Sequence, residues 1–220
     1  MTFEEYVSCR VMDLIVETFF NNALFEEVFC TLQKMNLSAF DCLCYIHKHP
    51  QVYTPRIKQI MDRFIFDTSK DLYSSYAEAV SCTSTPEVVG KFVAGELGIN
   101  ELLVHKAELY GEMEEIAEVL FQAVKVYLSE KKRLEPQIEE YFKELLRFVV
   151  CRKRKFYDCD EVAEQSFHYD FKLLADKNFE VDPTQVSWRE EPYRFTFYHD
   201  AGQKKYIKNT SALFQKTPTG

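Results

Sequence analysis

Apolar side chains recur every three to four positions over most of the first two thirds of the chain, which is the spacing of amphipathic helices. Thr2 and Glu5 stand in the order of a capping box and predict a helix that begins almost at the first residue. A second helix is predicted over 24–32, and Ser38 is expected to cap a third.

Two Thr-Pro pairs, at 54–55 and 85–86, mark further helix starts, because proline after a cap suits the first helical position. The first of these helices is expected to run to about Cys82 and the second to stop near Gly98. The broadest apolar stripe, over 102–128, predicts one continuous helix, and a last helix follows it. The predicted fold class is therefore mainly α, an irregular bundle of six to seven helices joined by short loops.

Beyond the helical region the period of the apolar positions changes from 3.6 to two. Aromatic and polar residues alternate over 166–173, which predicts a half-buried strand. The same alternation over 193–198 predicts a second strand. The two predict a small antiparallel sheet near the C-terminus.

The end of the chain carries another helix signal, since Asp200 and Gln203 again have capping-box spacing. We therefore expect a helical bundle over 1–155 and a small α+β unit over 156–220, with a two-stranded sheet and a terminal helix. That unit is too small to stand alone, so we expect it to pack on the bundle.

The charge of the chain argues against a nucleic-acid partner. Lys and Arg number 27 against 35 Asp and Glu, a formal net charge of −8 that repels phosphate. One basic run, 152–155, opposes this balance. We expect it to face the last carbonyls of a helix and solvent, with a phosphate contact as the alternative.

The seven cysteines show no paired spacing, and no secretory segment precedes the first helix. Both features predict free thiols in a reducing compartment, and hence a cytoplasmic protein. No apolar stretch approaches the length of about 20 residues that spans a bilayer, so no membrane partner is expected.

The densest group of metal-type side chains lies at 42–49. Cys44 and His47 share one face of the expected helix and are the candidate ligands, whereas Cys42 lies on another face. The four residues Cys42, Cys44, His47 and His49 therefore cannot all bind one tetrahedral metal ion. Buried cysteines with boundary histidines are the alternative interpretation.

A second candidate set, Glu101, His105 and Glu108, follows a spacing of i, i+4 and i+7 on one helix. Carboxylate-bridged metal bundles need a Glu-x-x-His unit on each of two helices, and the chain contains none. A solvated acidic face explains these residues as well, so no cofactor or metal is assigned to this chain.

Five residues near the N-terminus are candidate contacts to a partner or ligand. Arg10 is a cation in mid-helix, and Asn21 lies in an amide-rich turn beside Phe19 and Phe20, with Phe25 just beyond. The structural alternative is that Asn21 ends the helix and that Arg10 pairs with a carboxylate.

The N-terminal stretch 2–10, continuing through 17–22 to Phe25, resembles the start of a known domain. The segments Ser-Phe-His-Tyr-Asp-Phe at 166–171 and Pro-Tyr-Arg-Phe-Thr-Phe at 192–197 resemble its end. The domain is the uncharacterised C-terminal one that follows the radical SAM domain in cobalamin-binding-type radical SAM proteins. The two matches bracket nearly the whole chain.

The chain lacks the other parts of such proteins, including the Cys-x-x-x-Cys-x-x-Cys motif that holds the iron-sulfur cluster. The resemblance therefore implies a non-catalytic accessory domain that docks on a radical SAM core, in cis or in trans, and helps to shape its substrate cavity. Iron-sulfur cluster, S-adenosylmethionine and cobalamin would belong to the parent protein only.

Two other hypotheses come from different classes. One is a free-standing helical interaction module that uses an aromatic surface around Phe19, Phe20 and Phe25. The other is a small metalloenzyme built on Cys44 and His47 or on the acidic helix. The substrate of any parent enzyme cannot be read from these residues.

Overall fold

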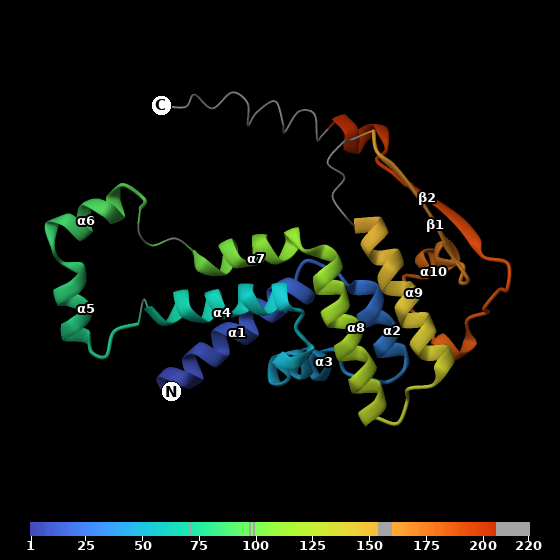
Figure 1. The fold of residues 1–220 in the computed structure, drawn as a ribbon, viewed down its shortest axis with the longest axis horizontal. Helices are drawn as coiled ribbons and strands as arrows, with labels where there is room; N and C mark the ends of the chain where they lie inside the picture. The colour runs from blue at the N-terminus through green and yellow to red at the C-terminus, as the bar shows by residue number, and fades with distance from the viewer. Residues whose placement is uncertain (71, 97, 99, 154–159, 206–220) are drawn as a thin grey trace. The chain divides into compact units, whose positions relative to one another are not determined.

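The computed structural model describes residues 1–70, 72–96, 98, 100–153 and 160–205. Within these residues the fold is mainly helical with one two-stranded antiparallel sheet, as predicted (Figure 1). The helices that precede the sheet are α1 (Phe3–Phe19), α2 (Glu26–Lys34), α3 (Ala39–Lys48), α4 (Pro55–Lys70), α5 (Tyr76–Thr83), α6 (Pro86–Val93), α7 (Glu101–Gly111), α8 (Met113–Glu130) and α9 (Pro136–Lys153), with a 3-10 turn, η1 (Pro50–Val52), after α3.

The C-terminal part contains β1 (Val162–Phe167), α10 (Phe171–Asp176), the 3-10 turn η2 (Pro183–Gln185) and β2 (Tyr193–Tyr198). Residues 201–205 are helical, and the predicted capping box is present. The Asp200 main-chain N–H donates to Gln203 Oε1 at 2.9 Å, and the Gln203 N–H donates to Asp200 Oδ1 at 2.8 Å.

The described residues contain nine α-helices before the sheet because two helices predicted as continuous are each divided. The one expected to reach Cys82 stops at Lys70, and Ser75 caps α5 by accepting a hydrogen bond from the Glu78 N–H. The one expected over 102–128 is interrupted at Glu112, directly after Gly111, a residue that destabilises helix interiors.

The predicted strand over 166–173 is wrong in its position. The strand is β1, which ends at Phe167, and Asp170 caps α10 by accepting a hydrogen bond from the Leu173 N–H at 3.0 Å. Because Phe167, Tyr169 and Phe171 are all buried on this turn, their alternation looks like that of a strand.

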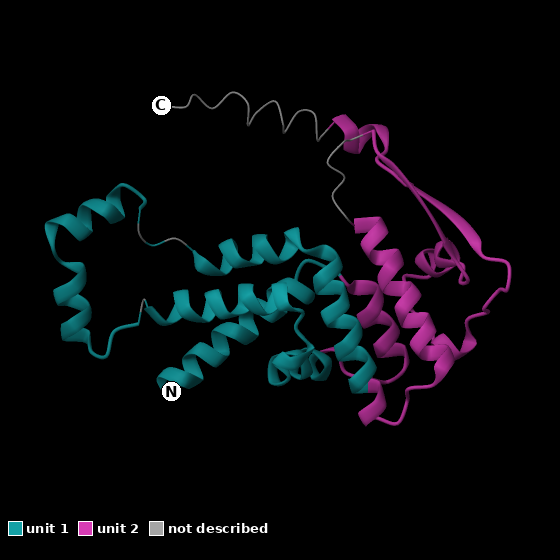
Figure 2. Ribbon diagram, in the orientation of Figure 1, with its two compact units in different colours: residues 1–24, 40–127 teal, residues 25–39, 128–220 magenta. Residues whose placement is uncertain are grey.

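Contacts between Cα atoms divide the chain into two compact units, each made of two segments (Figure 2). Unit 1 comprises 1–24 and 40–127, and unit 2 comprises 25–39 and 128–220. The predicted boundary near residue 155 was drawn from a change of period and stays a prediction.

In unit 1, the helices α1, α4 and α7 pack on one another. Their contact faces bury apolar side chains, and the polar links between them are described below. The core of these three helices includes Leu14, Ile15, Phe19, Ile57, Ile60, Met61, Phe64 and Leu109.

In unit 2, α9 packs against α2 on one side and against the sheet on another. Phe148 of α9 is the centre of an aromatic cluster, with ring centroids 4.8 to 6.2 Å from those of its neighbours. The sheet therefore packs on α9. A two-stranded sheet needs such packing because it is only marginally stable alone. The rings around Phe148 are Phe167, Phe171, Phe179, Phe195 and Phe197.

Candidate functional site

A connected set of polar groups in unit 1 surrounds His105 of α7, whose side chain is buried. Its Nε2 lies 2.9 Å from Oδ2 of Asp67 on α4, and its Nδ1 lies 3.3 Å from Oε2 of Glu108. Glu108 in turn bonds to Arg63 of α4 at 2.8 Å, and Asp67 bonds to Lys70 at the same distance. Two of the three residues predicted from their spacing, His105 and Glu108, are therefore close together. The other partner of His105 is Asp67, which the spacing along one helix could not identify.

The hydrogen-bond partners of His105 decide which of its ring nitrogens carries a hydrogen. A carboxylate only accepts, so Nε2 of His105 carries the hydrogen that points to Asp67. Hydrogen bonds from Lys70 and His105 lower the pKa of Asp67, which keeps this carboxyl charged. The arrangement is an ionic connection between α4 and α7.

The geometry of His105 does not favour a shared metal ion, since its two ring nitrogens face different carboxylates. Among the described residues, no group of three or more His, Cys, Asp or Glu side chains is placed to hold a metal.

The other metal candidates, Cys44 and His47, lie on α3. Nε2 of His47 is 3.0 Å from the carbonyl oxygen of Ser8 and 3.2 Å from its hydroxyl, so this nitrogen is engaged with α1. Cys42 is fully buried, and burial raises the pKa of its thiol to about 12. The histidine therefore ties α3 to α1, and Cys42 is a core residue.

Arg10 pairs with a carboxylate, in agreement with the structural alternative. Its Nη1 lies 2.9 Å from Oδ2 of Asp13, and its guanidinium lies over the ring of Phe64 at 5.9 Å from the centroid. The cation is thus held between α1 and α4, and its charge is locally balanced.

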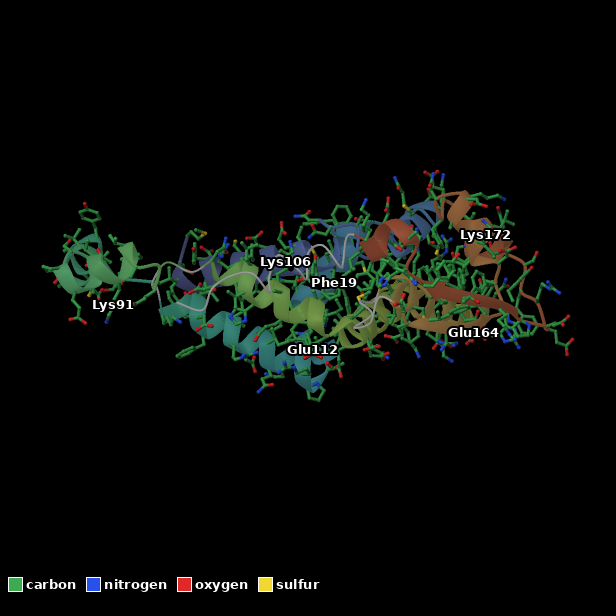
Figure 3. All side chains as sticks on the ribbon, turned by 90° about the horizontal axis from the view of Figure 1, so that it is seen from above. Phe19, Lys91, Lys106, Glu112, Glu164 and Lys172 are labelled. Carbon is green, nitrogen blue, oxygen red and sulfur yellow. The ribbon has the colours of Figure 1, made fainter. Side chains whose placement is uncertain are left out.

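Asn21 lies just after α1, in a network centred on Glu17 that includes Lys106 of α7, the residue labelled on that helix in Figure 3. Asn21 Nδ2 donates to Glu17 Oε1 at 2.6 Å, and Lys106 Nζ lies 2.5 Å from Oε2. The hydroxyl of Tyr110 donates to the Glu17 carbonyl at 3.1 Å and accepts from Asn22 Nδ2 at 2.8 Å. The hydrogen bonds from Lys106 and, to a lesser extent, Asn21 lower the pKa of Glu17. The bonds of Lys106 and Tyr110 fix α7 to the C-terminal end of α1.

The three aromatic residues proposed as a surface have different environments. Phe19 and Phe25 are buried, and only Phe20, 47% exposed, reaches solvent. The first two side chains fill the cores of their units, so they do not form a surface with Phe20.

The basic run has a role that its composition did not reveal. Arg152 and Lys153, in the last turn of α9, lie 3.1 and 2.8 Å from the two carboxylate oxygens of Glu27 on α2. Glu27 is buried, so the cations neutralise a charge inside unit 2. The rest of the run, 154–155, lies outside the described residues.

Unit 2 contains a second buried carboxylate, Glu144 of α9. One of its oxygens accepts a hydrogen bond from the His168 main-chain N–H at 2.8 Å. Burial raises the pKa of Glu144, an effect that this hydrogen bond only partly offsets.

We expect Glu144→Gln to change the pH dependence of stability. Because the pKa is raised on folding, the folded state binds the proton more tightly, and its contribution is lost as pH rises from 4.5 through the raised value. Gln keeps the acceptor without the charge, so unfolding titrations should show its advantage over the wild type growing from acidic to neutral pH. Glu164→Gln, at an exposed site of β1, is the control. A constant difference across this pH range would contradict the prediction.

His168 and Asp170 lie outside the strand, since β1 ends at Phe167 and Asp170 caps α10. The His168 ring stacks on Trp188 at 4.8 Å, and its Nδ1 donates to the Arg189 carbonyl at 2.7 Å. The main-chain N–H of Arg189 returns a bond to the His168 carbonyl at 2.9 Å. These contacts hold the 186–192 loop against the turn before α10.

A different kind of feature lies in α5 and α6, where no described residue is buried. Large apolar side chains are nevertheless present, and the most exposed are Tyr76 at 87% and Val93 at 86%. The others exposed on the pair are Val80, Val89 and Phe92. Exposed apolar groups at this density are typical of an interaction surface.

Comparisons of the chain with protein-family models, with curated proteins and with solved structures found no match. Within the described part of the chain, none of the helices combines the length and the apolar character that crossing a membrane requires.

Proposed function

We propose that this chain is an accessory domain, without a catalytic centre of its own, that docks on a radical SAM core through α5 and α6. The sequence resemblance at both ends of the chain suggests the partner. The exposed apolar side chains of α5 and α6 support the choice of docking element.

The lengths of these two helices support a docking role. Each has eight residues, and helices shorter than about 12 residues are marginal in water without tertiary packing. A partner surface that buries Tyr76, Val89 and Val93 would supply the missing packing and stabilise the pair.

In this proposal the chemistry belongs to the core. Iron-sulfur cluster, S-adenosylmethionine and cobalamin would bind there, and the docked helices would help to close the substrate cavity. In this proposal the polar networks around His105 and Glu17 have a structural role, since they hold α1, α4 and α7 together.

The test is binding of the full chain to the cobalamin-binding and radical SAM portion of a resembling protein, measured by biolayer interferometry. Val89→Ser with Val93→Ser should weaken binding at least about tenfold, since burial of even one valine side chain contributes about 1.5 kcal/mol. Phe66→Ser is the matched control because it removes a larger exposed apolar side chain from α4 of the same unit.

Two results would contradict the proposal. One is no binding of the wild-type chain to the core. The other is equal loss in the α6 double variant and in the Phe66 control, which would indicate non-specific apolar adhesion. Capture of an unrelated protein with no binding to the core would favour the free-standing interaction module.

A further inference from the structure

The outer edge of β2 carries hydrogen-bonding groups that have no partner among the described residues. In the part of the chain that the structure describes, β2 pairs with β1 alone, in a register that joins Val162 to Tyr198 and Phe167 to Tyr193. In an antiparallel strand every second residue turns its main-chain N–H and C=O away from the neighbour. Within the described part of the chain, none of those outward groups in Tyr193–Tyr198 is bonded to another group.

The composition of β2 favours pairing at this edge. Its sequence is Tyr-Arg-Phe-Thr-Phe-Tyr, all residues with high strand propensity except the one cation. Natural edge strands are usually protected by several charges, a proline or a bulge, and β2 has only Arg194. The edge of β1 is less suited because Ala163 and Glu164 are depleted in strands.

β2 is also complementary to itself. If two copies pair antiparallel about Phe195, then Phe195 faces Phe195, Tyr193 faces Phe197, and Arg194 faces Thr196. Directly opposite residues share a face, so the aromatic side chains meet on the side that covers Phe148. No like charges oppose each other in this register.

The helices beneath the sheet fit the same arrangement. Phe148 contacts Phe167 of β1 as well as Phe195 and Phe197 of β2, and the backbone of α9 lies nearer to β1 than to β2. The centres of two ribbons joined at β2 lie two strand spacings apart, about 10 Å. Because α9 lies nearer to β1, the two α9 helices would be at least this far apart and would leave room for the two β2 strands to pair.

The geometry points to a homodimer in which β2 of one copy pairs with β2 of a second, centred on Phe195, to form a four-stranded antiparallel sheet. The interface is independent of the proposed docking through α5 and α6. Each copy then has one sheet edge left, that of β1.

Sedimentation equilibrium of the full chain over a wide concentration range tests the dimer. Thr196→Arg places two Arg-Arg pairs across the interface and should raise the dimer Kd roughly 3- to 30-fold. Thr196→Glu, made together with Glu164→Gln so that no like charges face each other within the ribbon, places two Glu-Arg pairs there and should lower it. Within one chain Thr196 faces Glu164, so the arginine favours the ribbon itself, and loss of folding cannot explain weaker dimerisation.

Val162→Arg adds the same charge to the outer face of β1 and should leave the dimer Kd unchanged. A wild-type chain that stays monomeric at every concentration would overturn the inference. So would a dimer whose Kd changes in the same direction, or not at all, for the two Thr196 variants.

Discussion

Phe148→Ala is expected to destabilise unit 2 by about 3–5 kcal/mol, the usual cost of removing a buried phenylalanine. The reason is the position of this ring, which is buried and packs on rings from β1, β2 and α10. Alanine would leave a cavity where the sheet packs on α9, so the ribbon would lose its support.

Urea unfolding followed by tryptophan fluorescence measures this effect, because Trp188 is the only tryptophan of the chain and belongs to unit 2. Phe66→Ala, on the exposed side of α4, is the control and should cost less than about 0.5 kcal/mol. A loss below about 1 kcal/mol in the Phe148 variant would show that the aromatic cluster rearranges to fill the space.

Glu27→Ala is expected to cost about 2–4 kcal/mol, because it removes the carboxylate that neutralises Arg152 and Lys153. The cost is below that of a fully buried pair because the Arg152 side chain is half exposed and can turn to water. The same urea titration checks it, and a double-mutant cycle with Lys153→Met should give a coupling above about 1 kcal/mol.

Lys34→Ala is the matched control for the ion pair on α2. Lys34 lies 3.0 Å from Glu180, but both side chains are about half exposed, so its loss should cost less than about 1 kcal/mol. Equal losses in the two variants would mean that burial adds nothing to the Glu27 interaction.

Local signals in the sequence predicted much of the fold. Thr2 with Glu5 and Asp200 with Gln203 form the expected capping boxes, because such bonds depend only on residues three positions apart. The strand at 193–198 is also correct, since its alternation is not interrupted. The two Thr-Pro pairs likewise precede α4 and α6, which begin at Pro55 and Pro86.

The errors arise where a competing local interaction or a distant partner decides the structure. Asp170 caps a helix inside an alternating segment, and Gly111 breaks a helix whose apolar stripe continues through it. The contacts of His105 with Asp67 and of Glu27 with Arg152 join residues far apart in the sequence, which periodicity cannot pair. The β2 edge is visible only once the register is known.

The division of unit 2 into two segments has a consequence for synthesis on the ribosome. The segment 25–39 emerges early, but the rest of its unit begins only at residue 128. At about 5–20 residues per second the interval lasts roughly 5–20 s. During this interval the side chains of Val28, Phe29 and Leu32 cannot be buried in the core of unit 2. They therefore stay exposed on the nascent chain, where chaperones can bind them.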